Sequence, residues 1–417
     1  MQHIGIKFFA TFFALATLCI VGLYAADAPA SFYTLNTQNG LSSNRVLQML
    51  QLRDGRMVVV TDRAVDVYDG QRFTSATIDT SQWVAVPAYR GATHLFADGH
   101  DRLWMKQWRR LYCLDLRTMR WLRDFGWSAD DFFITDDGET WLWDGRRLCA
   151  EASRRELELP SDAGNLQDVV SLADSIYTFF STGQLAVYQP DGRLAYVTDA
   201  YAEPQRAMYA ATSLVVIAAD GNFYQVRTGR GGSILLSYSP KSHQWRQLLS
   251  LDVLMHTLTP TPTGMLYLTT ADGYLRIDCE TGNVVSFSEL RLPDGSVLST
   301  GINTVRLDRE GGIWLGTYGN GLLYTSPQSG LFDTRPIDIE VFPILTNIFL
   351  HGQPLQVGRD YDGETLLDVM PPYAERLSFA HDQNSLAFQF STMNYVRPRS
   401  TCYRYRFSGD VGRWHTY

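Results

Sequence analysis

The chain has 417 residues, a formal net charge of −8 at pH 7 and a charged fraction of 19%. This is the length of two or three average domains, and 45% apolar with 13% aromatic residues excludes a largely disordered chain. An acidic chain without a long basic run lacks the charge from which general nucleic-acid binders take their affinity, so we expect no DNA or RNA partner. The 33 glycines and 16 prolines, with little helical periodicity, favour many short strands joined by tight turns.

Residues 1–30 are typical of an export signal. Lys7 precedes an apolar run from Phe8 to about Ala26, and small residues follow. We expect cleavage after Ala25 or Ala30. The alternative is an uncleaved anchor in the inner membrane, because the run approaches the ~20 residues that a spanning helix needs.

The cysteines beyond this segment are widely spaced and form no C-x-x-C pair. This spacing predicts free thiols and no zinc site. The four are Cys113, Cys149, Cys279 and Cys402.

A repeat of about 43 residues runs through most of the chain. Its clearest copy, residues 302–326, reads as a strand, a Gly-containing turn, a strand that opens with Ile313-Trp314, a second turn and a third strand. Taking the first residue of each second strand as a marker gives seven copies, at Met57, Leu103, Thr140, Ile176, Leu214, Leu266 and Ile313. Repeats of this length with several strands are typical of β-propeller blades. We predict a seven-bladed β-propeller over residues 31–332, closed so that no sheet edge is exposed.

An aromatic residue follows most of the markers. We predict that these side chains pack between neighbouring blades. They are Trp104, Trp141, Tyr177, Tyr267 and Trp314. The fifth copy is the least regular, because the stretch 227–251 is long and Gly-rich.

Residues 338–417 differ from the repeats. Short alternating strands, the turns His351-Gly352 and Asp362-Gly363, and the breaker Pro371-Pro372 indicate a second all-β domain. Within it, Leu386, Phe388 and Phe390 alternate at period two and share one face of a strand. We expect half of a β-sandwich packed against the propeller.

Two stretches resemble a known family. The copies with D-x-x-G, then Ile or Leu before Trp, then G-T-x-x-G-L resemble the regulator propeller repeats of periplasmic sensors in Bacteroidetes hybrid two-component systems, most clearly at 311–322. Residues 384–414 resemble the start of the Ig-like three-tyrosine domain that follows such propellers. The matching positions are Asn394-Tyr395, Pro398, Tyr403, Tyr405, Gly409 and Trp414.

The resemblance implies a periplasmic sensor that recognises a polysaccharide breakdown product. Family members usually carry two propellers, whereas this chain has room for one. Its three-tyrosine domain is expected to be incomplete, and a histidine kinase region, as in full-length relatives, would lie outside this chain. A homodimer is compatible with such signalling.

The common enzyme signatures are absent, and we predict neither catalysis nor a cofactor nor a metal. The paired acids Asp130-Asp131 and Asp136-Asp137 fall at or near expected turns, where Asp is common for conformational reasons. His94 and His100 flank another turn and are expected to be solvated. Asp360, Asp362 and Gly363 lack the later acidic ligand of a calcium loop.

Topology indicates where a ligand would bind. In a blade with alternating strands, the turns between strands two and three and the connections between blades emerge at one end of the ring, and ligands favour such loop-built faces. A Trp beside cations suits a sugar ring that carries a carboxylate or sulfate. A solvated turn with an incidental Trp is the alternative interpretation. The candidate ligand-binding residues are Arg63, Lys106, Trp108, Arg109, Tyr318 and Asn320.

Three functions remain open at this point. The favoured one is a ligand-sensing ectodomain that binds an oligosaccharide and signals through a downstream region. The alternatives are a propeller-type polysaccharide lyase or glycosidase, and a periplasmic scaffold for other proteins.

Overall fold

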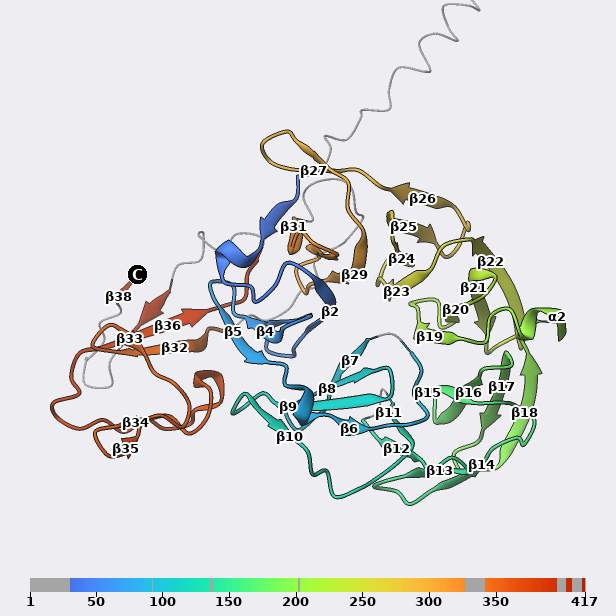
Figure 1. Ribbon diagram of the computed structural model, residues 1–417, viewed down its shortest axis with the longest axis horizontal. Helices are drawn as coiled ribbons and strands as arrows, with labels where there is room; N and C mark the ends of the chain where they lie inside the picture. Colours follow the sequence, from blue (N-terminus) through green and yellow to red (C-terminus); the bar gives the residue numbers. More distant parts are fainter. Residues whose placement is uncertain are drawn as a thin grey trace, which may run out of the picture.

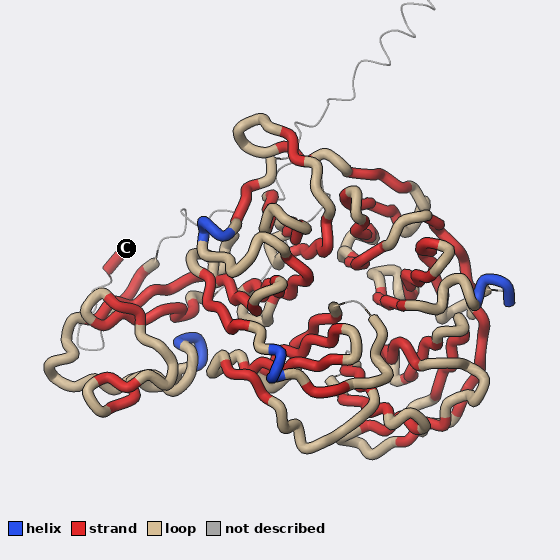
Figure 2. Tube along the Cα trace, viewed as in Figure 1, coloured by secondary structure: helices blue, strands red, loops and turns tan. Residues whose placement is uncertain are grey.

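The computed structural model describes residues 31–91, 93–135, 138–201, 203–326, 342–395, 403–406 and 415–416. Strands and loops make up almost all of this part of the chain, with only short helical segments (Figure 2), which confirms the predicted all-β class. The helical segments are η1 (Thr37–Asn39), η2 (Thr80–Gln82), α2 (Glu203–Arg206) and η4 (Pro371–Tyr373). Within the described ranges, no helix has the length and apolar character needed to cross a bilayer.

Seven antiparallel sheets are arranged around a ring, as in a β-propeller, and we number them as blades in chain order (Figure 1). Blade 1 contains β2 (Val46–Gln51), β3 (Met57–Thr61), β4 (Ala64–Tyr68) and β5 (Phe73–Thr77). Blade 2 contains β7 (His94–Ala97), β8 (Arg102–Gln107), β9 (Arg110–Asp115) and β10 (Arg120–Leu122), with the short β6 (Val84–Ala85) also paired to β9. Blade 3 contains β11 (Asp131–Ile134), β12 (Thr140–Trp143), β13 (Arg147–Ala150) and β14 (Glu156–Glu158).

Blade 4 contains β15 (Leu166–Leu172), β16 (Ser175–Phe180), β17 (Gln184–Tyr188) and β18 (Leu194–Asp199). Blade 5 contains β19 (Thr212–Ile217), β20 (Phe223–Gly229), β21 (Gly232–Ser239) and β22 (Gln244–Leu251). Blade 6 contains β23 (Met255–Pro260), β24 (Met265–Thr270), β25 (Gly273–Asp278) and β26 (Val284–Phe287). A small hairpin, β27 (Leu290–Arg291) and β28 (Val297–Leu298), then leads to β29 (Ile302–Leu307), β30 (Ile313–Thr317) and β31 (Leu322–Thr325) of blade 7.

The fourth strand of blade 7 comes from the other end of the chain. β1 (Tyr33–Leu35) pairs antiparallel with β31, with Tyr33 opposite Tyr324. Next to it, Phe32 is 1% exposed and packs with Ile302 and Leu323. Because the first described strand completes the last sheet, the ring is closed by β pairing and not only by side-chain packing.

The core lies between the blades. Each of seven apolar clusters combines side chains from two neighbouring sheets, for example Trp104 of blade 2 with Phe132 of blade 3. The aromatic residues predicted to pack there are buried, which confirms that expectation. The indole Nε1 of Trp104 donates to Asp98 Oδ2 at 2.8 Å, and that of Trp314 donates to Asp308 Oδ2 at 2.9 Å. In both blades the Asp that follows the first strand therefore accepts from the one polar group that burial of the Trp would leave unpaired.

The predicted register of the fifth blade is wrong by one strand. Leu214 lies in the first strand, β19, and the second strand begins at Phe223. The residue equivalent to Trp104 is Tyr224, whose hydroxyl donates to Asp220 Oδ2 at 2.8 Å. Alternation at period two does not distinguish a first strand from a second one, and the turn 220–222 resembles either connection.

The inner strands of four blades contain a shift in register. It occurs in β2, β15, β23 and β29, in each case near the start of the strand. A β-bulge of this kind redirects side chains locally. At the same point, Gln48 of β2 accepts a hydrogen bond from Thr304 of β29 at 2.6 Å, so the bulged ends of neighbouring inner strands are joined across the ring centre.

The C-terminal part forms smaller sheets beside blade 1 (Figure 1). Three strands, β32 (Ile344–Leu350), β33 (Gln353–Pro354) and β36 (Leu386–Ser391), form one sheet. Two-stranded pairs are formed by β34 (Asp360–Tyr361) with β35 (Glu364–Thr365) and by β37 (Arg404–Tyr405) with β38 (His415–Thr416). Phe388 and Phe390 are nearly half exposed. Their face of β36 is thus not the one that packs on the ring.

This C-terminal part docks on the turns between first and second strands and between third and fourth strands. Tyr395 is 7% exposed, stacks with Tyr68, meets Trp314 edge to face, and donates from its hydroxyl to Gly55 O at 2.8 Å. Polar contacts surround this aromatic cluster: Asn347 donates to Asp69, Gln389 to Gln71, and Arg56 to the Tyr373 hydroxyl. Burial of Tyr395 agrees with a structural role for the Asn-Tyr motif that the sequence singled out.

Several predicted features lie outside the described residues. These are the export segment 1–30, the acids Asp136-Asp137, Cys402, and the motif positions Pro398, Gly409 and Trp414. The other three cysteines beyond the export segment are free thiols, as predicted, and Cys113 is fully buried.

Candidate ligand-binding surfaces

The ring has two unlike ends. Antiparallel pairing in each blade places the turns between second and third strands, together with the connections between blades, at one end. We call this the open end, because the C-terminal part hydrogen-bonds to Gly55, Arg56, Asp69 and Gln71, which all belong to turns of the opposite end. The turns singled out from the sequence in blades 7, 1 and 2, which are neighbours in the ring, emerge at the open end.

Trp108 and Arg109 form the two-residue turn between β8 and β9. Both have positive φ, 35° and 65°, so a Trp and an Arg occupy a hairpin turn that normally favours Asn or Gly. Trp108 is 61% exposed, and the Arg90 guanidinium lies 6.0 Å from its ring centroid. The turn thereby presents a large aromatic face next to a cation at the surface.

A second aromatic residue of the open end lies in blade 7. Tyr318 is 56% exposed, and the Arg45 guanidinium lies 4.6 Å from its ring centroid. Asn320, in the same turn, is exposed and donates from its backbone N–H to Thr317 Oγ1 at 2.8 Å. Arg63, in the corresponding turn of blade 1, is also exposed.

Lys106 does not lie in the turn where the sequence analysis put it. It belongs to strand β8, its side chain is 2% exposed, and its Nζ contacts Asp131 Oδ1 at 2.9 Å and donates to Phe132 O at 2.7 Å. The rings of Tyr89, Phe132 and Phe133 surround the ammonium. Lys106 is therefore a buried ion-pair partner between blades 2 and 3, turned away from the open end.

The acids and histidines considered in the sequence occupy different environments in the structure. Asp131 is the buried partner of Lys106, and His100 is exposed, as expected. His94 is not in an exposed turn, contrary to our expectation: it is a partly exposed residue of strand β7 and borders a cavity at the ring centre. Burial, followed by the charges of Lys106 and Arg306, lowers the pKa of His94 to about 3.

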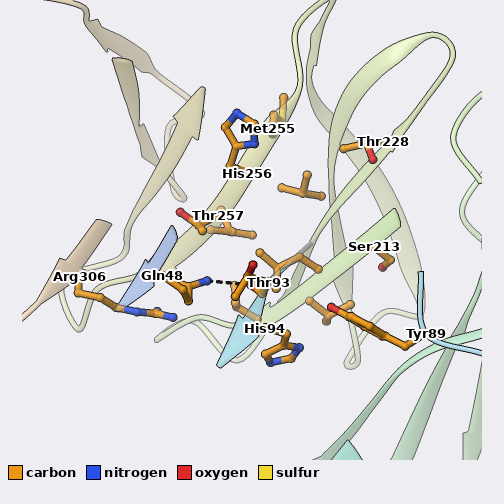
Figure 3. A pocket seen from close by; sticks show the side chains of 15 residues that line it. Gln48, Tyr89, Thr93, His94, Ser213, Thr228, Met255, His256, Thr257 and Arg306 are labelled. Carbon is orange, nitrogen blue, oxygen red and sulfur yellow. Dashed lines mark hydrogen bonds between the residues drawn. The ribbon is translucent and has the colours of Figure 1, made fainter. Parts of the chain in front are cut away.

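The cavity at the ring centre has a volume of about 160 Å³ (Figure 3). Its wall is built by the inner strands of blades 1, 2, 5, 6 and 7, together with residues of β20 and of the connection before β7. Figure 3 shows Arg306 and Gln48 at one side, Ser213 and Tyr89 at the other, and His94 between them. No sequence pattern indicated this site. Its residues share no motif, and only ring closure brings positions 48 and 306 together.

Charge is unevenly distributed around the cavity. Arg306 reaches it from β29, and burial lowers the pKa of its guanidinium to about 10, so the group is still charged at pH 7. Asp168 of β15 lies near Lys106, and burial raises the pKa of its carboxyl to about 7 even though Lys106 opposes that shift. Within the described ranges, no three His, Cys, Asp or Glu side chains are grouped as metal ligands.

Comparison with known proteins identifies the fold. No protein-family model matches the sequence, and no curated protein is similar to it in sequence. Among solved structures, the extracellular domain of the putative hybrid two-component system BT4673 from B. thetaiotaomicron matches 76% of this chain and 41% of that chain, with a TM-score of 0.51 and 15% identity. The chain resembles an extracellular sensor domain in fold.

Two further solved domains are similar. The extracellular domain of BT4673 described as a putative one-component system matches 93% of this chain and 52% of its own, with a TM-score of 0.50 and 14% identity. That of the putative hybrid system BT3049 from the same organism matches 78% and 46%, with a TM-score of 0.49 and 15% identity. This chain spans about half the length of the solved domains it matches.

Proposed function

We propose that this chain is the ligand-sensing part of an exported two-component-type receptor and that it binds an acidic oligosaccharide derived from a polysaccharide. In this proposal, residues 31–332 are the ligand-binding propeller, residues 338–417 begin a three-tyrosine β-sandwich, and residues 1–30 are a signal peptide or a membrane anchor. Similarity in fold to the extracellular domain of BT4673 supports the sensor role. The signal passes to a region downstream of this chain, in a receptor that acts as a homodimer.

One observation carries the ligand proposal: the open end presents two exposed aromatic rings, each beside an arginine. These are Trp108 with Arg90 and Tyr318 with Arg45. A sugar ring stacks on an exposed aromatic face, and a guanidinium forks a carboxylate or sulfate on the same sugar. An exposed cation–π contact contributes only ~0.5–1 kcal/mol, so Arg45 can turn to a ligand at low cost. Arg90 also donates to the carbonyls of Pro87 and Tyr89 and would exchange those hydrogen bonds for the ligand.

The position of the C-terminal part supports coupling. It contacts the end of the ring opposite to the proposed ligand surface, chiefly on blades 1 and 7 through Tyr395, Tyr68 and Trp314. Trp314 lies in the strand that leads into the turn bearing Tyr318. Ligand contact at Tyr318 is thus one strand away from the docking cluster.

Binding is tested by calorimetry with the full chain against uronate-containing and sulfated oligosaccharides, with neutral oligosaccharides of equal length as the comparison. Trp108→Ala and Tyr318→Ala should each weaken binding at least tenfold, which is a loss of about 1.4 kcal/mol or more. Tyr33→Ala is the matched control, because Tyr33 is 59% exposed on the outer strand of blade 7 and away from the open end. It should bind as the wild type does.

Two results would contradict the proposal. Equal affinity of Trp108→Ala, Tyr318→Ala and wild type for every bound sugar would remove the open end as the binding surface. Appearance of new reducing ends or unsaturated products during incubation would favour the lyase or glycosidase alternative. Coupling is tested separately by hydrogen exchange, in which ligand should change the protection of residues 386–395.

A further inference from the structure

Two arginines of the ring, one fully buried and one partly exposed, differ in their partners. Arg227 is 0% exposed, and its guanidinium donates to the carbonyls of Phe180 at 2.9 Å and Ser181 at 2.6 Å. Arg306, among the described residues, donates only from Nε to Met49 O at 2.8 Å, and no carboxylate pairs with it. The rest of its guanidinium is directed into the central cavity, towards Gln48 and His94 (Figure 3).

A partly buried charge without a counter-ion still carries a desolvation cost, and part of that cost is recovered when an anion joins it. Arg306 remains protonated at pH 7 despite the lowering of its pKa by burial. The two histidines of the cavity are neutral there, because burial lowers the pKa of both His94 and His256. The cavity therefore offers one net positive charge at Arg306, with neutral ring nitrogens and hydroxyl groups around it.

The negative groups near the cavity limit what this charge can bind. Asp131 is paired with Lys106 beyond Tyr89, and Asp168 lies close to the same lysine. Their potential opposes an anion with two charges. The rest of the wall presents both polar groups and apolar side chains, and the apolar ones favour an organic tail over an inorganic ion. The apolar residues of the wall are Leu214, Val215, Val216, Val226, Met255 and Leu258.

The volume of the cavity sets the size of the ligand. At about 160 Å³, it matches an apolar cavity of about 150 Å³ that holds benzene, a molecule of about six heavy atoms. A hexuronic acid is about twice as large. We propose that the central cavity binds a monocarboxylate of three or four carbons, with its carboxylate on the Arg306 guanidinium and its carbon chain against the apolar wall.

This site does not rest on the oligosaccharide proposal, since it uses other residues and lies inside the ring. A ligand there contacts strands of blades 1, 2, 5, 6 and 7 at once. It binds only the closed ring, so occupancy raises the melting temperature by mass action. The chain would then respond to two ligands, a sugar at the open end and a small acid at the centre.

The test is the melting temperature of the full chain as butyrate is titrated, with butyramide as the uncharged probe of equal shape and inorganic phosphate as the inorganic anion. We expect a saturating rise of several degrees with butyrate and none with the other two. Arg306→Met should abolish the rise while leaving the melting temperature without ligand unchanged or higher, because it removes a partly buried charge that has no counter-ion among the described residues. Arg193→Met, at a 77% exposed side chain, controls for non-specific anion effects and should respond as wild type does.

Saturation-transfer NMR on the wild-type chain keeps the inference testable if Arg306→Met does not fold. Butyrate should receive saturation and butyramide should not. A rise that persists in Arg306→Met, a rise that does not saturate, or equal transfer to butyrate and butyramide would each overturn the inference. None of these outcomes bears on binding at Trp108, so failure here is distinguishable from failure of the oligosaccharide proposal.

Discussion

Replacing Lys106 by Met should strongly destabilise the ring. The ammonium is 2% exposed and Asp131 is 3% exposed, with 2.9 Å between Nζ and Oδ1. Removing the lysine leaves the buried Asp131 carboxylate with the backbone N–H of Phe132 as a hydrogen-bond donor but without a counter-ion. It also leaves the Phe132 carbonyl without the donor that lies 2.7 Å away. Breaking a buried pair in this way costs about 3–5 kcal/mol. Three aromatic rings within 4.4–5.3 Å also lose a cation, which places Lys106→Met towards the upper part of this range.

The double variant Lys106→Met/Asp131→Leu distinguishes the cost of an unpaired buried charge from the net contribution of the ion pair to stability. Both charges are then gone and neither is left unpaired, so the free energy of unfolding should return to within about 1–2 kcal/mol of wild type. Arg193→Met is the matched control, because Arg193 pairs with Asp191 at 2.6 Å on the surface. That variant should change the free energy of unfolding by less than about 0.5 kcal/mol.

The assay is urea denaturation at pH 7, followed by Trp fluorescence and by circular dichroism. A loss below about 1 kcal/mol for Lys106→Met, or a double variant no more stable than the single one, would refute the ion-pair reasoning. It would also reopen the sequence interpretation of Lys106 as a surface ligand, because an exposed lysine would show this behaviour.

Three further predictions concern ring closure, pH dependence and docking. Phe32→Ala should cost about 3–5 kcal/mol in thermal or urea unfolding, since Phe32 anchors the closing strand β1, and an unchanged melting temperature would argue against closure by β1. Burial raises the folded-state pKa of Asp168 to about 7, so the contribution of its protonated carboxyl to stability is lost as pH rises from about 4 to 7. Asp168→Asn should flatten the dependence of the unfolding free energy on pH in that range, and an unaltered slope would contradict the assignment. Tyr395→Ala should loosen the C-terminal part from blades 1 and 7 and speed limited proteolysis within residues 342–395, whereas Tyr405→Ala, at an exposed tyrosine, should leave the cleavage rate unchanged.

The regular features of this fold were predictable because each blade repeats the same local chemistry. Alternating apolar residues, Gly-containing turns and an aromatic residue after five of the seven predicted second-strand markers are local patterns. They gave the number of blades, six of the seven registers and the burial of Trp104, Trp141 and Trp314. The burial of Tyr224 was not predicted, because the second-strand marker of blade 5 was placed in the first strand.

The exposure of the candidate ligand-binding residues was predictable for some of them and not for others. Exposure of Trp108 and Tyr318 could be expected from their positions in short turns, whereas Lys106, two residues before Trp108, turned out to be buried. Along a strand, successive side chains point to opposite faces, and the identity of the residue does not tell which face meets a neighbouring blade. Asp131, the partner that decides the matter, is 25 residues away in the chain.

The sequence by itself determined the period of the repeat, and with it the all-β class, the ring and its seven blades, because hydrophobic periodicity and turn chemistry act over a few residues. Only the tertiary structure decided which strand closes the ring, where the C-terminal part docks, and that Gln48, His94, His256 and Arg306 surround one cavity. These residues come from inner strands of different blades, and closure of the ring brings them within contact distance, with burial then setting their charge.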